Sequence, residues 1–349
     1  MKHSPRTALA VLAVSLPALH AFQPRFDSVS FAPEAGATVD KELTLEATMY
    51  LEDLVMILNG SEMPPEMLGG AMDEGLIMNA AVEVSDEYVR SAKGKPVELL
   101  RTFTGMVLEM GTESEAETVD EFGEIEDSTV RFRWDADEDE YIVTYEDGSG
   151  DEDLLEGLSP DMDFLALLPD GDVDRDDTWE VSDVDSIVTL FFPGGLAMPN
   201  PGDEEGAELF EEFSDELEAQ LRESFEDFTV HCKYNGAREE DDARLGEIGF
   251  KFEGEASLDL SDMLTEMISL QGGEMDISAD VQATVDLEFE GEGTMLWNLG
   301  GGHVAGFEMS SEMLLLGDIE ADVEAMGESQ TVEVSVEVAG EMEWELSTD

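Results

Sequence analysis

The most constraining feature of this chain is an alternation of apolar and polar residues that continues far longer than most strands do. Every odd position from Met275 to Trp297 is apolar or glycine. Similar alternation runs from His303 to Ala325, from Val332 to Leu346 and from Ile248 to Leu260. A period of two sends successive side chains to opposite faces, and strands usually run about 5–6 residues. These stretches predict an antiparallel meander of long strands with one apolar and one acidic face.

The connections between these stretches predict the direction of the strands. The links at Asn298–Gly302 and Met326–Ser329 are too short for a parallel crossover, which needs about a dozen residues or more. We therefore expect residues 246–346 to form one contiguous antiparallel sheet.

The first half of the chain shows the same pattern over shorter stretches. Strands are expected at residues 43–58, 77–84, 97–110, 130–134, 141–145, 178–181 and 187–192, with a short helix within 152–168. The predicted fold class is mainly β (α+β). Its long antiparallel sheets twist and curl in a half-barrel-like manner, since a flat open sheet would leave edges and apolar surface exposed.

One amphipathic helix is predicted at residues 203–227, to be packed on the sheet, because apolar residues recur there at three- and four-residue steps. These residues are Leu209, Phe210, Phe213, Leu217, Leu221 and Phe225. The Pro/Gly-rich segment 193–202 is the best linker candidate. It would separate a β-rich lobe, residues 22–192, from a helix-plus-meander lobe, residues 203–349. Arg133-Trp134-Asp135 and Leu296-Trp297-Asn298 each open a hairpin, which suggests that the lobes are duplicated.

Residues 1–21 are typical of a secretory signal peptide. Lys2, His3 and Arg6 form a basic start, residues 7–19 are apolar, and Ala21 suits cleavage. No cysteine lies near this point to carry a lipid, and no later apolar run approaches the roughly 18 residues that cross a bilayer. We expect a protein that is secreted or periplasmic and has no transmembrane segment.

The charge balance limits the possible partners. The 349 residues include 87 acidic and 16 basic ones, for a formal net charge of −71, or −73 without residues 1–21. Such charge opposes compaction unless salt screens it or cations bind. It argues against nucleic acids and anionic membranes, which need basic patches. Adaptation to a saline habitat is the first explanation, and specific cation binding is the alternative.

Two acidic turns are candidate cation sites. Asp135, Asp137, Asp139 and Glu146 match positions 1, 3, 5 and 12 of a calcium loop. Position 6 is Glu140 where that loop needs glycine, and the flanks predict strands, so an ordinary hairpin tip is the competing interpretation. A second set around Gly171 consists of Asp170, Asp172, Asp174 and Asp176. The sequence predicts weak Ca²⁺ binding at most and no other cofactor.

Candidates for catalysis are few. His231 and His303 are the two histidines outside the signal peptide, and His231 is adjacent to Cys232, the single cysteine. Neighbours on a regular strand point to opposite faces, so a Cys–His pair is not expected and Cys232 suits a buried structural position. A single cysteine also excludes an internal disulfide. The chain has no G-x-S-x-G, P-loop or G-x-G-x-x-G motif.

Two short motifs resemble a group of bacterial proteins. Leu167-Leu168-Pro169-Asp170-Gly171 is followed by Asp177-Thr178-Trp179, and Gly293-Thr294-Met295-Leu296-Trp297-Asn298 opens a hairpin further on. Similar turns occur in uncharacterised secreted or envelope proteins of bacteria, with Asp176 and Asn298 here in place of a usual Gly and Asp. The resemblance implies no activity and no catalytic residue.

These observations leave three hypotheses for function. The first is a non-catalytic binding or carrier protein that holds an apolar ligand or an envelope-protein segment between sheet and helix. The second is a structural or interaction protein of the cell surface whose acidic face recruits cations. A hydrolase is a distant third, because carboxylate pairs carry little information in so acidic a chain. The sequence leaves the oligomeric state open.

We predict that the melting temperature rises markedly between 0.01 M and 1 M salt. Glu204, Glu208, Glu212 and Glu216 stand four apart in the predicted helix, and each such pair costs roughly 0.2–0.5 kcal/mol when unscreened. The Debye length falls from about 30 Å to about 3 Å over this range. Thermal melts in salt, or in millimolar divalent cation, measure the effect. A flat melting temperature in both series would contradict the saline-habitat interpretation.

Overall fold

The computed structural model describes most of the chain between residues 26 and 348. The described residues are 26–64, 75–112, 114–119, 125–155, 157–191, 193–195, 220, 224, 228–240, 243–261, 263–265, 268, 277–325 and 328–348. The predicted signal peptide lies outside them, as does the predicted helix 203–227 apart from Gln220 and Ser224. Within this part of the chain, no helix is both long and apolar enough to cross a membrane.

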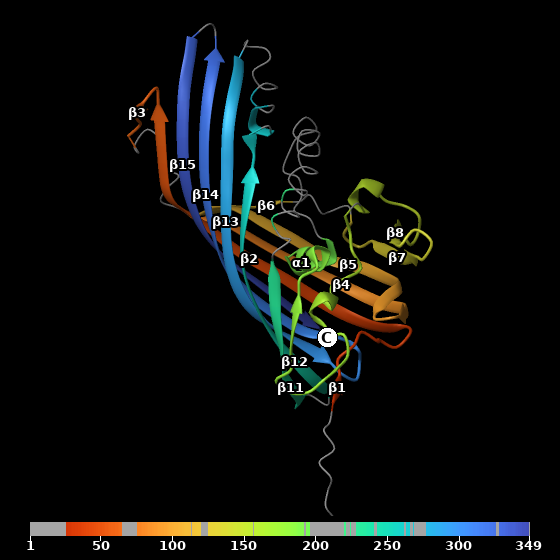
Figure 1. Cartoon of the computed structure of the whole chain (residues 1–349). Coiled ribbons are helices and arrows are strands. Elements are labelled where there is room, and N and C mark those ends of the chain that lie inside the picture. The colour runs from red at the N-terminus through yellow and green to blue at the C-terminus, as the bar shows by residue number, and fades with distance from the viewer. Residues whose placement is uncertain are drawn as a thin grey trace, which may run out of the picture.

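A single large antiparallel sheet dominates the structure (Figure 1). Its strands follow the order β10-β11-β12-β13-β14-β15-β2-β4-β5-β7-β8, with β3 beside β2 and β6 beside β5, and its two ends do not close on each other. The strands are β2 (Ala37–Leu58), β3 (Ser61–Glu62), β4 (Leu76–Ala92), β5 (Lys95–Thr112), β6 (Glu115–Val119), β7 (Thr129–Asp135), β8 (Glu140–Tyr145), β10 (Thr178–Val181), β11 (Thr229–Glu240), β12 (Ala243–Asp259), β13 (Ile277–Asn298), β14 (His303–Ala325) and β15 (Glu328–Thr348). Strands β1 (Asp27–Ser28) and β9 (Asp172–Val173) form a separate pair.

The predicted mainly β class and the antiparallel meander are confirmed. Strands β12, β13, β14 and β15 pair in sequence order and antiparallel, including across the two short connections. The turn between β13 and β14 is closed by the Gly302 N–H, which donates to the Asn298 carbonyl at 2.7 Å. The Asn298 side chain also accepts the N–H groups of Gly300 and Gly301.

Pairing between β15 and β2 joins the two halves of the chain. The register runs from Val332 opposite Leu58 to Thr348 opposite Lys41, with one bulge at Glu337/Val338. Strands from either side of the predicted linker therefore belong to the same sheet. The division into two lobes at residues 193–202 stays a prediction, since residues 196–202 lie outside the described part.

The predicted strand at 187–192 is wrong, because Val184–Phe191 forms the helix α1. Its start is capped by Asp183, whose carboxylate accepts the N–H of Ser186 at 3.0 Å and its hydroxyl at 2.8 Å. The first N–H groups of a helix have no partner within the helix, and this cap provides one of them with an acceptor. The resulting stabilisation outweighs the β preference of the branched residues that follow. Ile187 and Leu190 then fall on one buried face.

The short helix predicted within 152–168 is present only as short 3-10 helices. Among the described residues of this segment, these are Glu152–Leu155 and Leu165–Leu167. Gly157, with a positive φ of 75°, and Pro160 separate them. Leu155, Phe164 and Leu167 are nevertheless buried. These apolar side chains are thus buried although the backbone is not a continuous helix.

The main core lies between one face of the sheet and the segment 152–195, which lies in front of the sheet in Figure 1. Phe164 stacks on Phe307 of β14 with ring centroids 3.7 Å apart. Phe191 of α1 makes an edge contact with Phe252, at 5.4 Å between centroids. The Trp179 indole donates to the Leu167 carbonyl at 3.2 Å. This face of the sheet is thus covered by the chain's own apolar side chains.

Glycines on this face make room for aromatic rings from the neighbouring strand. Gly293 of β13 pairs with Phe250 of β12. A Cβ on Gly293 would lie 2.2 Å from the Phe250 ring and 2.4 Å from the Glu308 carbonyl oxygen. Gly291 and Gly293, the two glycines of the alternation, therefore have a structural role. The rings of Phe252 and Phe250 pack directly on their backbone, where a side chain would not fit.

We predict that Gly293→Ala lowers the free energy of unfolding by about 1–3 kcal/mol, because the methyl group overpacks a filled site. Gly171→Ala is the matched control, since nothing lies within 4 Å of the Cβ it would add. Urea unfolding at fixed salt measures both. Equal stability of the two variants would show that Phe250 can move away without cost.

Candidate functional site

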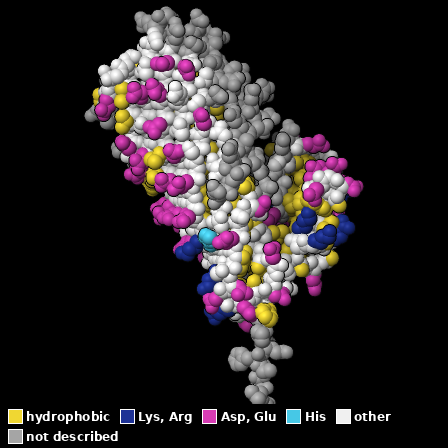
Figure 2. Space-filling model, in the orientation of Figure 1, with side chains coloured by type: hydrophobic (Ala, Val, Ile, Leu, Met, Phe, Trp, Pro, Cys, Tyr) yellow, Lys and Arg dark blue, Asp and Glu magenta, His cyan; other side chains and the backbone are white. Residues whose placement is uncertain are grey.

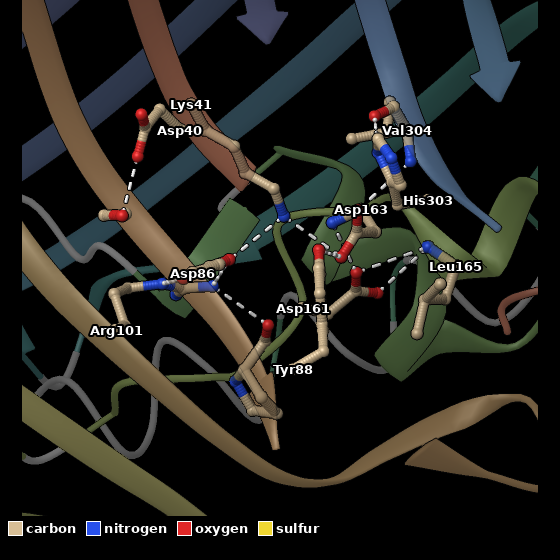
Figure 3. A network of polar contacts seen from close by, with 12 residues as sticks. Asp40, Lys41, Asp86, Tyr88, Arg101, Asp161, Asp163, Leu165, His303 and Val304 are labelled. Carbon is tan, nitrogen blue, oxygen red and sulfur yellow. Dashed lines mark hydrogen bonds and ion pairs between the residues drawn. The ribbon is translucent and has the colours of Figure 1, made fainter. Parts of the chain in front are cut away.

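Three neighbouring strands each place one charged side chain on the apolar face of the sheet. Lys41 comes from β2, Asp86 from β4 and Arg101 from β5, and all three are fully buried. They meet two carboxylates, Asp161 and Asp163, from the segment between the 3-10 turns (Figure 3). We call these five residues the buried ion network.

Asp86 is at the centre of the buried ion network. Its carboxylate accepts two hydrogen bonds from Arg101, from Nε at 2.7 Å and from Nη2 at 3.0 Å. Lys41 Nζ donates to the same carboxylate at 3.0 Å. Arg101 also donates to the carbonyls of Ser159 and Pro160, each at 3.0 Å. The guanidinium therefore links the sheet to the segment that covers it.

Asp163 makes the second link between the sheet and its cover, the segment 152–195. Its Oδ2 atom lies 3.0 Å from Lys41 Nζ and accepts the Tyr88 hydroxyl at 2.7 Å. Its Oδ1 atom accepts the backbone N–H of Val304 at 3.2 Å. Three strands, β2, β4 and β14, thus bind one carboxylate of the covering segment.

Asp161 holds the turn that carries Asp163. Its carboxylate accepts the N–H of Asp163 at 2.9 Å and that of Leu165 at 3.1 Å. Phe164, between them, has the left-handed conformation (φ 53°, ψ 46°), which is unfavourable for a bulky residue. The Asp161 hydrogen bonds therefore stabilise a strained turn.

The pKa values in the buried ion network follow from burial and charge. Burial alone would raise the pKa of Asp86, but the charges of Arg101 and Lys41 outweigh it and hold that pKa below its usual range. Burial and the charge of Asp163 raise the pKa of Tyr88 well above its usual range. Burial and the charge of Asp163 also raise the pKa of Asp161 to about 6. Asp86 thus stays ionised at neutral pH, which suits a structural role more than acid–base catalysis.

The other face of the sheet is exposed and acidic. Acidic side chains are spread along the long strands in the view of Figure 2, whereas basic side chains gather in a few places. Cross-strand pairing arranges this face in rows, since residues directly opposite each other share a face. One row consists of Glu253, Glu290, Glu312 and Glu341, from four successive strands. We call this surface the acidic face.

Two grooves run across the strands on the acidic face. The larger, of about 1160 Å³, lies between two rows of side chains and extends from β10 to β2. Its basic residues already face carboxylates: Lys233 contacts Asp176 at 2.7 Å, Lys251 contacts Glu292, and His231 lies 3.4 Å from Glu180. This groove is therefore of mixed charge.

The smaller groove, of about 860 Å³, has no basic residue among the described residues that line it. One wall is the row of four glutamates, Glu253, Glu290, Glu312 and Glu341. The opposite wall begins with Glu255 and Glu288 and continues with Leu314, Ala339 and Tyr50. We call it the glutamate groove. It combines uncompensated carboxylates with an apolar strip.

The first set of candidate calcium ligands is spread over the β7–β8 hairpin. Asp135 and Asp139 lie at its tip, where the Asp137 N–H donates to the Asp135 carboxylate at 2.9 Å. Glu146 follows the far end of β8 and contacts Arg131. A strand rises about 3.3 Å per residue, so Glu146 is too distant to share one ion with the tip. The predicted acidic hairpin itself is confirmed by the pairing of Asp135 with Glu140.

The second set is spread over the turn before β9, β9 itself and the turn that follows it. Asp172 is part of β9 and pairs with Ser28, while the N–H of Asp174 donates to the Asp177 carboxylate at 2.7 Å. Asp170 lies in the turn before β9, and Asp176 pairs with Lys233. Within the described ranges, no group of three or more histidine, cysteine or acidic side chains has an arrangement that could hold a metal ion.

His231 and Cys232 lie on opposite faces of β11, as predicted. His231 is exposed on the acidic face, and Cys232 is buried in the core. Burial raises the pKa of the Cys232 thiol to about 12, so the thiolate needed for nucleophilic attack is absent at neutral pH. His303 lies beside the glycine turn, where its Nδ1 is 2.7 Å from the Val304 carbonyl oxygen.

The buried ion network was missed in the sequence, although a signal exists. Lys41, Asp86 and Arg101 each interrupt an apolar alternation. Their neighbours at two-residue steps are, respectively, Val39 and Leu43, Val84 and Tyr88, and Leu99 and Phe103. A charged residue in the apolar register of a strand requires a buried partner. Three such interruptions in one predicted sheet would have indicated an internal ion cluster, although not which residues pair.

Comparisons with known proteins identify no relative. No family model matches the chain, and none of the curated proteins does. Among solved structures, an outer membrane channel from Pseudomonas putida F1 is 8% identical, covers 88% of this chain and 97% of its own, and has a TM-score of 0.16. OccK7 (OpdD) of Pseudomonas aeruginosa is 10% identical, covers 88% and 98%, and has a TM-score of 0.11. Scores this low do not establish a shared fold.

We predict that Arg101→Met lowers the free energy of unfolding by about 3–5 kcal/mol, because Asp86 would lose a fully buried partner. Arg131→Met is the control, since Arg131 bridges Glu98 and Glu146 at a partly exposed site and such pairs contribute about 0–1 kcal/mol. Urea unfolding in 1 M salt measures both losses. A loss of less than 1 kcal/mol for Arg101→Met would contradict a structural role for the network.

Proposed function

We propose that the protein is a non-catalytic binding protein whose ligand surface is the acidic face of the sheet. The observation that carries this proposal is the glutamate groove, in which several carboxylates lie side by side without a described basic partner. Neighbouring strands are about 4.8 Å apart, and like charges directly opposite each other are destabilising. A bound cation would relieve this repulsion, so the groove favours cationic ligands.

The shape of the glutamate groove favours an elongated ligand. Its row of carboxylates repeats once per strand, while Leu314, Ala339 and Tyr50 offer an apolar strip beside it. An aliphatic polyamine combines both properties, because methylene groups separate its ammonium groups. Four single bonds of about 1.5 Å each span roughly 5 Å, which is close to the strand spacing. We therefore take a linear polyamine as the ligand class.

The remaining chemistry of the chain is consistent with binding without catalysis. The Cys232 thiol is buried and protonated, while His231 faces away from it on the exposed side of β11. The predicted signal peptide supports a secreted or periplasmic location, which stays a proposal. In that location the acidic face would meet cationic ligands or envelope partners.

A second candidate is a carrier that holds an apolar ligand on the opposite, apolar face. Leu45, Met78 and Leu108 form a small buried cluster there, separate from the main core. Met110, two residues along β5 from Leu108, is 37% exposed. The predicted helix 203–227 would cover such a ligand in a half-barrel-like cradle. This helix, the half-barrel curvature and the proposed duplication of the two lobes stay predictions.

We predict that the double variant Glu290→Gln, Glu312→Gln weakens spermine binding about tenfold or more. A charge-assisted hydrogen bond contributes roughly 1.5–3 kcal/mol, and 1.4 kcal/mol corresponds to a factor of ten. Isothermal titration of the full chain with spermine at constant ionic strength measures the affinity.

The matched control is Glu320→Gln, Glu333→Gln. This pair is also directly cross-strand, exposed and on the acidic face, but it lies outside both grooves. It removes the same charge, so it should leave spermine affinity nearly unchanged. Equal losses in both variants would mean diffuse charge attraction without a site. Absence of spermine binding, together with binding of a hydrophobic fluorophore to the folded protein, would favour the carrier.

A further inference from the structure

The charges of the buried ion network do not balance when all of its carboxylates are ionised. Lys41 and Arg101 supply two positive charges, and Asp86 and Asp163 match them through direct ion pairs and hydrogen bonds. Asp161 adds a third carboxylate. Among the described residues, its carboxylate accepts hydrogen bonds only from the backbone N–H groups of Asp163 and Leu165. An unpaired charge in a buried network is unfavourable, and protonation removes it.

We propose that Asp161 is a proton-operated latch, which fastens residues 159–168 to the sheet when it is protonated and loosens them when it is ionised. The latch acts through the cover of the apolar face. This inference is independent of the ligand proposed for the acidic face.

The groups around Asp161 come from several elements. Lys41 on β2 and Tyr141 on β8 interact with it electrostatically, as does its near neighbour Asp163. The other charged or titratable members of the surroundings are Asp86 and Tyr88 on β4, Arg101 on β5 and His303 beside Val304 on β14. In Figure 3 Asp161 and Asp163 lie close together below Lys41. The burial of Asp161 and the repulsion from Asp163 favour the protonated form. They outweigh the backbone N–H groups of Asp163 and Leu165 and the attraction of Lys41, which favour the ionised form.

Asp161 is placed where its protonation state would affect the whole cover. Its backbone carbonyl accepts the N–H of Gly194 at 2.7 Å, just after α1. Its side chain holds the strained turn at Phe164, whose ring stacks on Phe307 of the sheet. Asp161 keeps some contact with solvent, so protons can reach it without unfolding of the core. A loosened turn would free Phe164 first and the α1 region next.

The sign of the pH dependence follows from the raised pKa of Asp161. A carboxyl group with a folded-state pKa of about 6 and an ordinary value of 3.8 stabilises the closed form fully below pH 3.8 and loses this effect as the pH rises through 6. At about pH 5, one unit below this pKa of about 6, the ratio of closed to open form is about tenfold higher than at pH 8. Asp86 titrates below its usual range and does not contribute in this window.

Hydrogen exchange tests the latch on the full chain in 1 M salt, which screens the surface carboxylates. We expect the protection factor of residues 159–168, after correction for intrinsic exchange, to be about tenfold higher at pH 5 than at pH 8. Peptides from β13 and β14 serve as the internal reference, since diffuse charge relief would raise their protection equally. Equal protection of residues 159–168 at both pH values would overturn the proposal.

Asp161→Asn separates ionisation from hydrogen bonding. Asparagine keeps an oxygen that can accept the N–H groups of Asp163 and Leu165 but cannot ionise, so protection should become high and independent of pH. Asp170→Asn, at an exposed position in the turn before β9, should keep the wild-type dependence. An unchanged pH dependence in Asp161→Asn would overturn the assignment to this residue. If that variant does not fold, the wild-type protection factors decide alone.

Discussion

Backbone pairing between β15 and β2 is the interaction on which the rest of the structure depends. It aligns Trp344 with Leu45 and Glu343 with Glu46, so that both faces of the meander continue into the first half of the chain. The apolar face thereby becomes wide enough to be covered by the segment 152–195. The acidic face becomes wide enough for the larger groove to extend from β10 to β2. Without this pairing, each half would expose an unpaired edge strand, which favours aggregation.

Charge acts in opposite ways on the two faces of this sheet. On the acidic face, exposed glutamates repel one another in water and salt, where each interaction is weak and screened. On the apolar face, a few buried charges are bound by several partners each, and their removal from water makes every missing partner costly. Lys41 illustrates the second case, because it bridges Asp86 of the sheet and Asp163 of the cover at 3.0 Å each. The acidity of the surface and the stability of the core are therefore set by different residues.

Spacing along the chain does not by itself decide whether the candidate cation ligands meet, for a physical reason. The spacing of Asp135 to Glu146 suits a calcium loop only if the chain curls around one point, but β8 extends between these residues and carries Glu146 to Arg131. The apolar segment 187–192 was expected to be a strand, yet the cap at Asp183 makes it helical, and the helix places Ile187 and Leu190 together on one buried face. An apolar pattern of only a few residues fits a strand and a helix equally well. In such short segments, capping hydrogen bonds decide which of the two forms.

The sequence by itself determined the long strands, their antiparallel order in the second half and the division into an apolar and an acidic face, because an alternation over such lengths has only one compatible backbone period. It also determined that His231 and Cys232 point apart. Only the tertiary structure decided that β15 pairs with β2, that Lys41, Asp86 and Arg101 meet Asp161 and Asp163, and that glutamates from four strands line one groove. These arrangements depend on register between distant segments, which local patterns do not encode.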